Sequence, residues 1–384
     1  MKGTWLSQQA NGKALENFFD RSRGRGHTIE SIIIWKDGHV VAKAAPAPYD
    51  TEDRAEVYSL SKAFCATAIG ILIDEGRLTL DTKIADVFPK AAVGGDKELT
   101  QATVEDLLTM RTGHTACVMP ALSRAFDPLK AFFAQKTDYP HGTHFAYNTG
   151  STYMLSAVLQ KITGMTVMDY LEPRLFQPLG IQGAWWNRCA GVSEGGVGLH
   201  VSAEDILKFC IMYLNEGVYE GKRIVSADWV RNASAAHADN SMNGTPDWCA
   251  GYGFQLWLNA SGGYRCDGAF GQLGIVLPEK KTVVAVRAMV DDMQSELEDI
   301  LRLVEEIDKE STQADIPDHM PLVCDGDIAP FEGLYRCAAN PFGWTQIRLG
   351  RAGTALSVTI SDGAREQRIL CGSGEWVDGT LWAK

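Results

Sequence analysis

Residues 58–64 read Tyr-Ser-Leu-Ser-Lys-Ala-Phe, and this stretch decides the fold. It opens a segment whose apolar residues recur at helical spacing, which predicts a helix from Ser59 to Glu75 that stops at Gly76. Positions i and i+3 share one face of a helix, so the amine of Lys62 can reach the hydroxyl of Ser59. A serine beside a base is the pair that acyl transfer requires, and Ser59 is therefore the candidate nucleophile.

Two local effects would favour loss of the Ser59 proton. A helix that begins at Ser59 directs the positive end of its dipole at the developing alkoxide. Burial of Lys62 among residues such as Ala63 and Ala66 would lower the pKa of its amine, which must be partly neutral to accept a proton. By composition alone a Ser-x-x-Lys is expected about once or twice in a chain of this length, so the motif needs support from its context.

That context comes from two further motifs. His144-Phe-Ala-Tyr-Asn-Thr-Gly150 precedes a predicted helix, and Tyr264-Arg-Cys-Asp-Gly-Ala-Phe-Gly-Gln272 opens a predicted late strand. With the Ser-x-x-Lys helix they resemble the serine β-lactamase and penicillin-binding superfamily, most closely its class C-like esterase branch. In that superfamily a Ser-x-x-Lys helix, a Tyr-x-Asn or Tyr-x-Ser loop and a His/Lys-x-Gly strand line one cleft. The resemblance covers roughly residues 28–310, including 107–114 and 176–181.

The resemblance implies a role for each residue of these motifs. Ser59 would be acylated, while Lys62 and Tyr147 would share the base role, protonate the leaving group and activate water. The backbone N–H groups of Ser59 and Ala269 would form the oxyanion hole. The substrate-binding positions would be Thr149, Cys266, Asp267, Gly268 and Phe270.

Tyr147 needs a further condition to act as a base. The pKa of an unperturbed tyrosine lies near 10, so a cation would have to lower it, and Lys62 is the cation available. The alternative for Tyr147 is a structural tyrosine in a turn or in the core.

Two positions depart from the pattern of the β-lactamases. Thr149 stands where they have Asn, and Cys266 stands where they have a Lys or His that helps to bind the substrate carboxylate. Strand alternation predicts that Arg265 points to the opposite face from Cys266. The sequence therefore favours hydrolysis of a small ester or amide. The alternatives are a β-lactamase or D-alanyl carboxypeptidase, and a non-catalytic ligand-binding protein on the same fold.

Several other signals favour structural roles. Gly191-Val-Ser-Glu-Gly195 matches the nucleophile elbow of α/β-hydrolases, but Ser193 runs into a glycine-rich stretch instead of a helix. His141 and His144 could bind a metal, yet they lie in a predicted turn without a third ligand at helical spacing. A lone Cys266 is more often a packing residue than a reactive thiol. The pair Trp185-Trp186 would line an acyl pocket or sit in the core.

Hydrophobic periodicity gives the order of the remaining elements. A strand pair broken by Asp37-Gly38 comes first. Helices are predicted over 103–110, 152–163 and 295–309 and after a capping box at Ser202, and strands over 252–259, 271–277 and 282–289. This order predicts an α/β fold in the loose sense (α+β), of the β-lactamase/transpeptidase type. Both ends of the domain would meet in one antiparallel sheet of five or more strands, flanked by helices and an all-helical lobe.

The end of the chain is expected to be separate. Residues 310–330 lose periodicity and carry several prolines, which predicts a linker. A hydrolase domain is therefore expected over 1–312. A small all-β domain is expected over 313–384, where residues 355–360 alternate in hydrophobicity.

Composition narrows the partners. The 384 residues carry a net charge of -12, which would repel a phosphate backbone, so nucleic acid is not expected. No signal-peptide core can be drawn over 1–20, and no apolar run reaches the roughly 18 residues of a membrane span. Nine cysteines without a Cys-x-x-Cys pair indicate reduced thiols. We expect a cytoplasmic enzyme for small molecules, without metal or organic cofactor; a chain trimmed of its leader would look the same, and homo-oligomerisation stays open.

Overall fold

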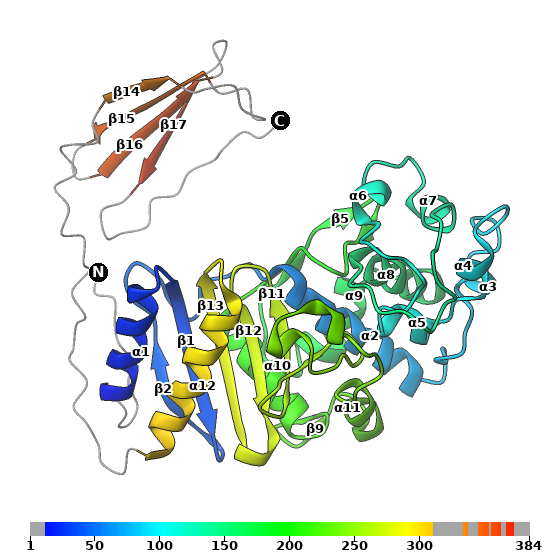
Figure 1. Cartoon of the computed structure of the whole chain (residues 1–384), viewed down its shortest axis with the longest axis horizontal. Coiled ribbons are helices and arrows are strands. Elements are labelled where there is room, and N and C mark those ends of the chain that lie inside the picture. Colours follow the sequence, from blue (N-terminus) through cyan, green and yellow to red (C-terminus); the bar gives the residue numbers. More distant parts are fainter. Residues whose placement is uncertain (1–11, 310–332, 337–344, 353–354, 362–365, 372–384) are drawn as a thin grey trace. The chain divides into compact units, whose positions relative to one another are not determined.

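The computed structural model describes residues 12–309, 333–336, 345–352, 355–361 and 366–371. These residues divide between two compact units. The larger unit contains 12–44 and 51–309, drawn from blue to yellow in Figure 1, and every candidate site residue lies in it.

A six-stranded antiparallel sheet forms the centre of the larger unit. Its strand order is β10 (Trp257–Leu258), β11 (Tyr264–Gly268), β12 (Gln272–Leu277), β13 (Thr282–Met289), β1 (Thr28–Lys36) and β2 (His39–Ala44). Asp37 and Gly38 turn the first hairpin with positive φ angles, as the primed turns of hairpins require. Because β1 pairs with β13, the two ends of this unit meet in one sheet, and the predicted fold class is confirmed.

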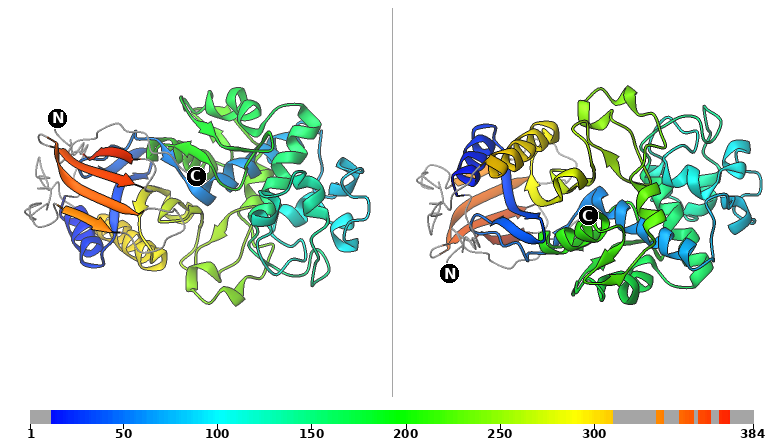
Figure 2. Two further views of the ribbon diagram at one scale, coloured as in Figure 1. Left: turned by 90° about the horizontal axis from the view of Figure 1, so that it is seen from above. Right: turned by 90° about the horizontal axis from the view of Figure 1, so that it is seen from below.

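Helices cover both faces of this sheet (Figure 1, Figure 2). α1 (Gly12–Gly24) and α12 (Met293–Lys309) lie together on one face, and α10 (Ala203–Leu214) lies on the other. α10 begins at the predicted capping box, in which Ser202 and Asp205 exchange hydrogen bonds. Every residue of β11 and β12 is buried, because a packed layer covers each face of the sheet.

A helical lobe adjoins the sheet and carries the rest of the core (Figure 1). Its elements are α2 (Ser61–Asp74), α3 (Ile84–Val87), α4 (Lys97–Gln101), α5 (Val104–Leu108), α6 (Met119–Leu122), α7 (Pro128–Phe133), α8 (Thr149–Thr163) and α9 (Val167–Leu171). Shorter pieces complete the unit: β3 (Ala55–Glu56), β4 (Trp185–Trp186), β5 (Arg188–Cys189), β6 (Val192–Ser193), β7 (Leu199–Val201), β8 (Val218–Tyr219), β9 (Lys222–Arg223) and α11 (Ala227–Ala233). α2 and α8 pack against each other and are buried along most of their length.

Two of the differences from the prediction concern the sheet and the layer of helices on it. The strand predicted over 252–259 shrinks to the two residues of β10, because Gln255 has a φ of 61° and its amide donates to the carbonyls of Leu107 and Leu108. These bonds tie the segment to α5 instead of to the sheet. Helix α1 was not predicted, because most of its residues are polar and its apolar stripe, which is buried, is short.

The smaller unit contains four strands in sequence order, each antiparallel to the next. They are β14 (Gly333–Arg336), β15 (Gln346–Ala352), β16 (Ala355–Ser361) and β17 (Glu366–Cys371). The linker predicted over 310–330 and the domain boundary after residue 312 lie outside the described residues, and the boundary stays a prediction. In the part of the chain that the structure describes, no helix has the length and apolar character needed to cross a bilayer.

The packing of α2 can be tested at Gly70. A Cβ at this position would overlap the Trp229 ring of α11. Gly70→Ala is expected to lower the free energy of unfolding by about 1–3 kcal/mol, because the ring must shift inside a close-packed core. Gly24→Ala is the matched control, since no heavy atom lies within 4 Å of a Cβ there and alanine is the better helix former. Urea unfolding measures both variants, and equal midpoints would contradict the assigned packing.

Candidate active site

Ser59 lies in a 3₁₀ turn, Tyr58–Leu60, and the α-helix begins two residues after it, at Ser61. The predicted helix start at Ser59 is therefore corrected. Tyr58 has a left-handed backbone with φ of 45°, a conformation that costs a non-glycine residue about 1–3 kcal/mol. The Tyr58 ring packs edge-on against Phe270 with centroids 5.2 Å apart, and its carbonyl accepts a hydrogen bond from the Ser61 hydroxyl. The surroundings thus hold the strained turn that presents Ser59.

Lys62 lies one turn further along and its amine faces the hydroxyl of Ser59. Its Nζ is 2.9 Å from Ser59 Oγ and donates a hydrogen bond to the Gly196 carbonyl at 2.8 Å. The side chain is 1% exposed, and this burial lowers the pKa of Lys62 to about 7. The direction is the one predicted from its apolar neighbours. A large fraction of the amine is therefore neutral near pH 7 and able to accept the Ser59 proton.

Tyr147 comes just before α8 and lines the same pocket as Ser59. Its ring stacks on Trp257 with centroids 5.2 Å apart, and Lys62 Nζ lies 4.8 Å from its centroid. Burial, followed by the charge of Asp267, raises the pKa of Tyr147 above its ordinary value. The expectation that Lys62 would lower this pKa is wrong, because the site that desolvates the lysine also desolvates the phenol. Tyr147 is protonated at neutral pH and can donate a proton.

The turn from β11 to β12 brings the Ala269 backbone to the pocket that Ser59 lines. Gly268 is required there, because a Cβ at this position would overlap the Val57 carbonyl oxygen. Gly271 has a φ of 87°, and a Cβ on it would lie 2.5 Å from a carboxyl oxygen of the buried Glu296. Two glycines thus let this turn approach both the segment that carries Ser59 and the helix α12.

A cavity of about 570 Å³ opens beside Ser59. Its other lining residues are Tyr147, Asn243, Thr245, Trp248, Trp257, Asp267, Gly268, Ala269, Asp291, Asp292, Met293 and Gln294. Sequence reasoning missed those from the loop before β10 and from the β13–α12 connection, because they belong to no motif. For the β13–α12 connection the sequence offered one signal, which is that it directly follows the strand predicted over 282–289.

The geometry agrees with comparisons to known proteins. The sequence profile of the beta-lactamase family matches residues 24–306. The chain belongs to the beta-lactamase family. It is similar to penicillin-binding protein 4 of Amycolatopsis lactamdurans, with 28% identity over 68% of this chain and 75% of the relative. It is also similar to the 6-aminohexanoate-dimer hydrolase of Paenarthrobacter ureafaciens, with 23% identity over 60% of this chain and 69% of the relative.

A solved structure shows the same fold. A family VIII carboxylesterase superposes with a TM-score of 0.59 at 16% sequence identity, over 78% of this chain and 97% of the esterase. This beta-lactamase family member is therefore a serine hydrolase by family, with esterases and amidases among its relatives and neighbours.

In this beta-lactamase family member Cys266 does not reach the pocket. Its thiol faces α10, where its sulfur lies 3.9 Å from that of Cys210, and it also contacts the Gly274 carbonyl at 3.5 Å. Cys266 was predicted to bind substrate at the position of the family's Lys or His. It is instead a core residue on the face of β11 that packs against α10. The packing of α10 on the sheet determines which face of β11 is turned to the core.

Arg265 lies on the opposite face from Cys266, as predicted, and this is the face that carries the pocket wall. Its guanidinium is fully buried, 4.3 Å from the Trp248 ring, and its Nε is 3.3 Å from Asp267. Burial raises the pKa of Asp267, while Arg265 and then Lys62 lower it. Arg265 is therefore a partner of the pocket's aspartate, and sequence reasoning missed this role.

The remaining predicted substrate-binding residues divide into two groups. Asp267 and Gly268 line the pocket. Thr149 packs its methyl group against Gly196, the residue whose carbonyl accepts the Lys62 bond, and Phe270 is 40% exposed beside Tyr58. Neither is among the described lining residues, so both support the site from outside the pocket.

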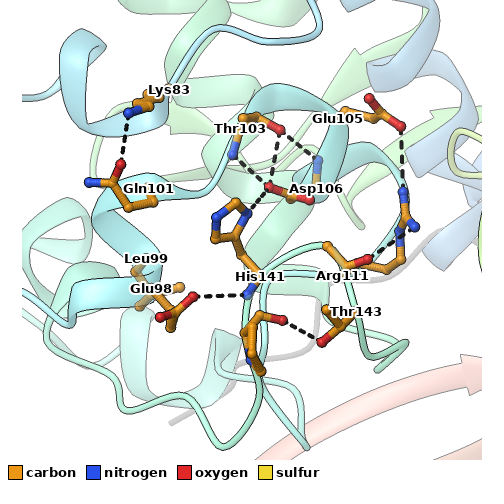
Figure 3. Close-up of polar contacts among 12 residues, drawn as sticks. Lys83, Glu98, Leu99, Gln101, Thr103, Glu105, Asp106, Arg111, His141 and Thr143 are labelled. Carbon is orange, nitrogen blue, oxygen red and sulfur yellow. Dashed lines mark hydrogen bonds and ion pairs between the residues drawn. The ribbon is translucent and has the colours of Figure 1, made fainter.

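His141 has a structural environment, as expected. Its Nδ1 lies 2.8 Å from Asp106 Oδ2, and its backbone N–H donates to Glu98 (Figure 3). Asp106 also closes the capping box of α5 with Thr103. The network joins α4 and α5 to the loop before Tyr147. His144 stacks on a tyrosine ring of the same loop.

The Gly-x-Ser-x-Gly motif around Ser193 also has a structural role. Ser193 is fully buried in the two-residue strand β6, and its carbonyl accepts a hydrogen bond from Ser156. Trp186 is buried and donates to the Val197 carbonyl, whereas Trp185 stacks on His200. Neither tryptophan is among the described residues that line the pocket.

Gly268→Ala tests the predicted oxyanion role of the turn between β11 and β12. The added methyl group must push the turn away from Val57 and take the Ala269 N–H with it. We expect the rate of labelling by a fluorophosphonate to fall about 100-fold or more, the usual effect of losing one oxyanion donor. Gly350→Ala is the control, because no heavy atom lies within 4 Å of a Cβ there. Labelling at the wild-type rate in a folded Gly268→Ala protein would contradict this placement.

Proposed function

We propose that this chain hydrolyses a small ester or amide through an acyl-enzyme on Ser59. The observation that carries the proposal is the buried Lys62 amine, with a pKa of about 7, at 2.9 Å from Ser59 Oγ. A general base is most effective when its pKa lies near the working pH. Selection for binding alone gives no reason to keep such a base beside a serine.

The acylation step follows from the lowered pKa of Lys62 and the raised pKa of Tyr147. The neutral Lys62 amine takes the Ser59 proton while Oγ attacks the carbonyl carbon. The N–H groups of Ser59 and Ala269 stabilise the oxyanion. Tyr147 donates its phenolic proton to the departing oxygen or nitrogen and regains one from the Lys62 ammonium. The products are the acyl-enzyme and an alcohol or amine.

Deacylation repeats these roles with water. The Lys62–Tyr147 pair accepts a proton from the attacking water, and the tetrahedral intermediate collapses with return of a proton to Ser59 Oγ. The carboxylic acid leaves, and Lys62 is again neutral.

Pocket charge supports an ester or amide over a β-lactam. The described lining residues include three aspartates and no Lys, Arg or His, so the carboxylate of a β-lactam would meet repulsion. The carboxylesterase and the 6-aminohexanoate-dimer hydrolase among the similar proteins agree with this preference. The 28% identity to a penicillin-binding protein favours β-lactam or D-alanyl peptide chemistry as the second candidate.

Intact-protein mass spectrometry separates these candidates. Wild type, Ser59→Ala and Ser193→Ala are each incubated with a fluorophosphonate and with a penicillin. We expect a fluorophosphonate adduct on wild type and Ser193→Ala and none on Ser59→Ala, with p-nitrophenyl butyrate turnover lost about 1,000-fold or more in Ser59→Ala.

An additional Ser59-dependent penicillin adduct would favour the second candidate. Absence of both adducts on wild type would favour a binding protein. Loss of the adduct in Ser193→Ala would move the nucleophile to the Gly-x-Ser-x-Gly segment.

A further inference from the structure

The rim of the Ser59 pocket is acidic. Asp291 and Asp292 are exposed at the connection from β13 to α12, and Asp267 lies deeper on the wall. Hydrogen bonds from Ser295 hold the pKa of Asp292 below its ordinary value, so this carboxylate is ionised at neutral pH. Unit charges of opposite sign attract by roughly 1 to 4 kcal/mol at 4 Å near a protein surface. The rim therefore attracts a cation.

Two cations lie behind the wall, and both are engaged. Lys62 donates to Ser59 and Gly196 and is partly neutral. Arg265 is buried and paired with Asp267, and it also donates to Asn259. Its positive charge offsets that of Asp267, which leaves the charges of Asp291 and Asp292 to dominate the opening.

Three aromatic rings form the wall between the rim and the nucleophile. Tyr147, Trp248 and Trp257 all line the cavity. Trp257 stacks on Tyr147, and its centroid lies 6.4 Å from that of Trp248. Electron-rich rings grouped in this way bind quaternary and protonated amines. Arg265, 4.3 Å from the Trp248 ring, shows that a ring of this cluster already accepts one cation on its face.

We infer that the substrate carries an ammonium group close to the scissile bond, an inference that rests on acyl transfer at Ser59. With the carbonyl carbon at Ser59, the ammonium group would lie against Trp248 and Trp257 and face the carboxylates of Asp291 and Asp292. The substrate class is an ester or amide of an amino alcohol, a diamine or an amino acid. The carboxylates of the rim and the faces of the aromatic rings both attract a cation and not a neutral group of the same shape. Together they discriminate between the two more strongly than the rim would alone.

Two pairs of isosteric esters test the inference on the full chain. The first pair is butyrylcholine and its analogue with a tert-butyl group in place of trimethylammonium, which places the charge in the alcohol. The second is the p-nitrophenyl ester of trimethylammonio-butanoate and its tert-butyl analogue, which places the charge in the acyl group. We expect kcat/KM to favour the cationic member of at least one pair by about tenfold or more.

Matched variants locate the effect. Asp291→Asn and Trp248→Leu are each expected to reduce the cationic-to-neutral ratio of kcat/KM about three- to fivefold, by removing an attractive charge or ring. Asp81→Asn removes the same charge from an exposed position that is not among the lining residues, and the ratio should not change. Equal falls in Asp81→Asn and Asp291→Asn would overturn the inference, because only net charge would then matter.

The outcomes also separate this inference from the proposed function. Ratios near one in both pairs, with Ser59-dependent cleavage of the neutral esters, would overturn the inference and leave the hydrolase intact. Absence of ester turnover together with absence of a fluorophosphonate adduct would overturn both.

Discussion

The buried contact between Lys62 and Ser59 is the interaction on which the rest of the site depends. An amine moved out of water loses its preference for the charged form, and here the pKa falls to about 7. The enclosure that causes this is structural: α2 is buried along most of its length, and the Gly196 carbonyl accepts from the amine. The same enclosure keeps Tyr147 protonated. One desolvated site thus places an amine that can accept a proton beside a phenol that can donate one.

Elements with local signals could be predicted from the sequence. The hairpin at Asp37-Gly38 depends on turn chemistry, the strand β13 on a run of apolar and β-branched residues, and the capping box at Ser202 on side-chain capping. All three are properties of neighbouring residues. The shortened β10 could not be predicted, because the bonds of Gln255 to the carbonyls of α5 involve residues far away in the sequence.

The residues of the candidate site likewise divide into those with a local sequence signal and those without one. Ser59, Lys62 and Tyr147 stand in motifs and were found from sequence, whereas Trp248 and Asp291 lie in connections without a motif and were not. The family resemblance placed Cys266 at a substrate-binding position, and alternation then put Arg265 on the opposite face. Neither says which face of β11 meets α10. The strained Tyr58 turn likewise depends on its contact with Phe270, which only the folded chain provides.

The most direct test of this account is the pKa of Lys62 itself. Protein with isotope-labelled lysine ε-carbons would be titrated by NMR, and the signal that is lost in Lys62→Arg would be assigned to Lys62. A midpoint of about 7 would agree with a desolvated amine ready to deprotonate Ser59. A midpoint near 10, the value of an ordinary lysine, would mean that the amine stays charged and that a different group activates the serine.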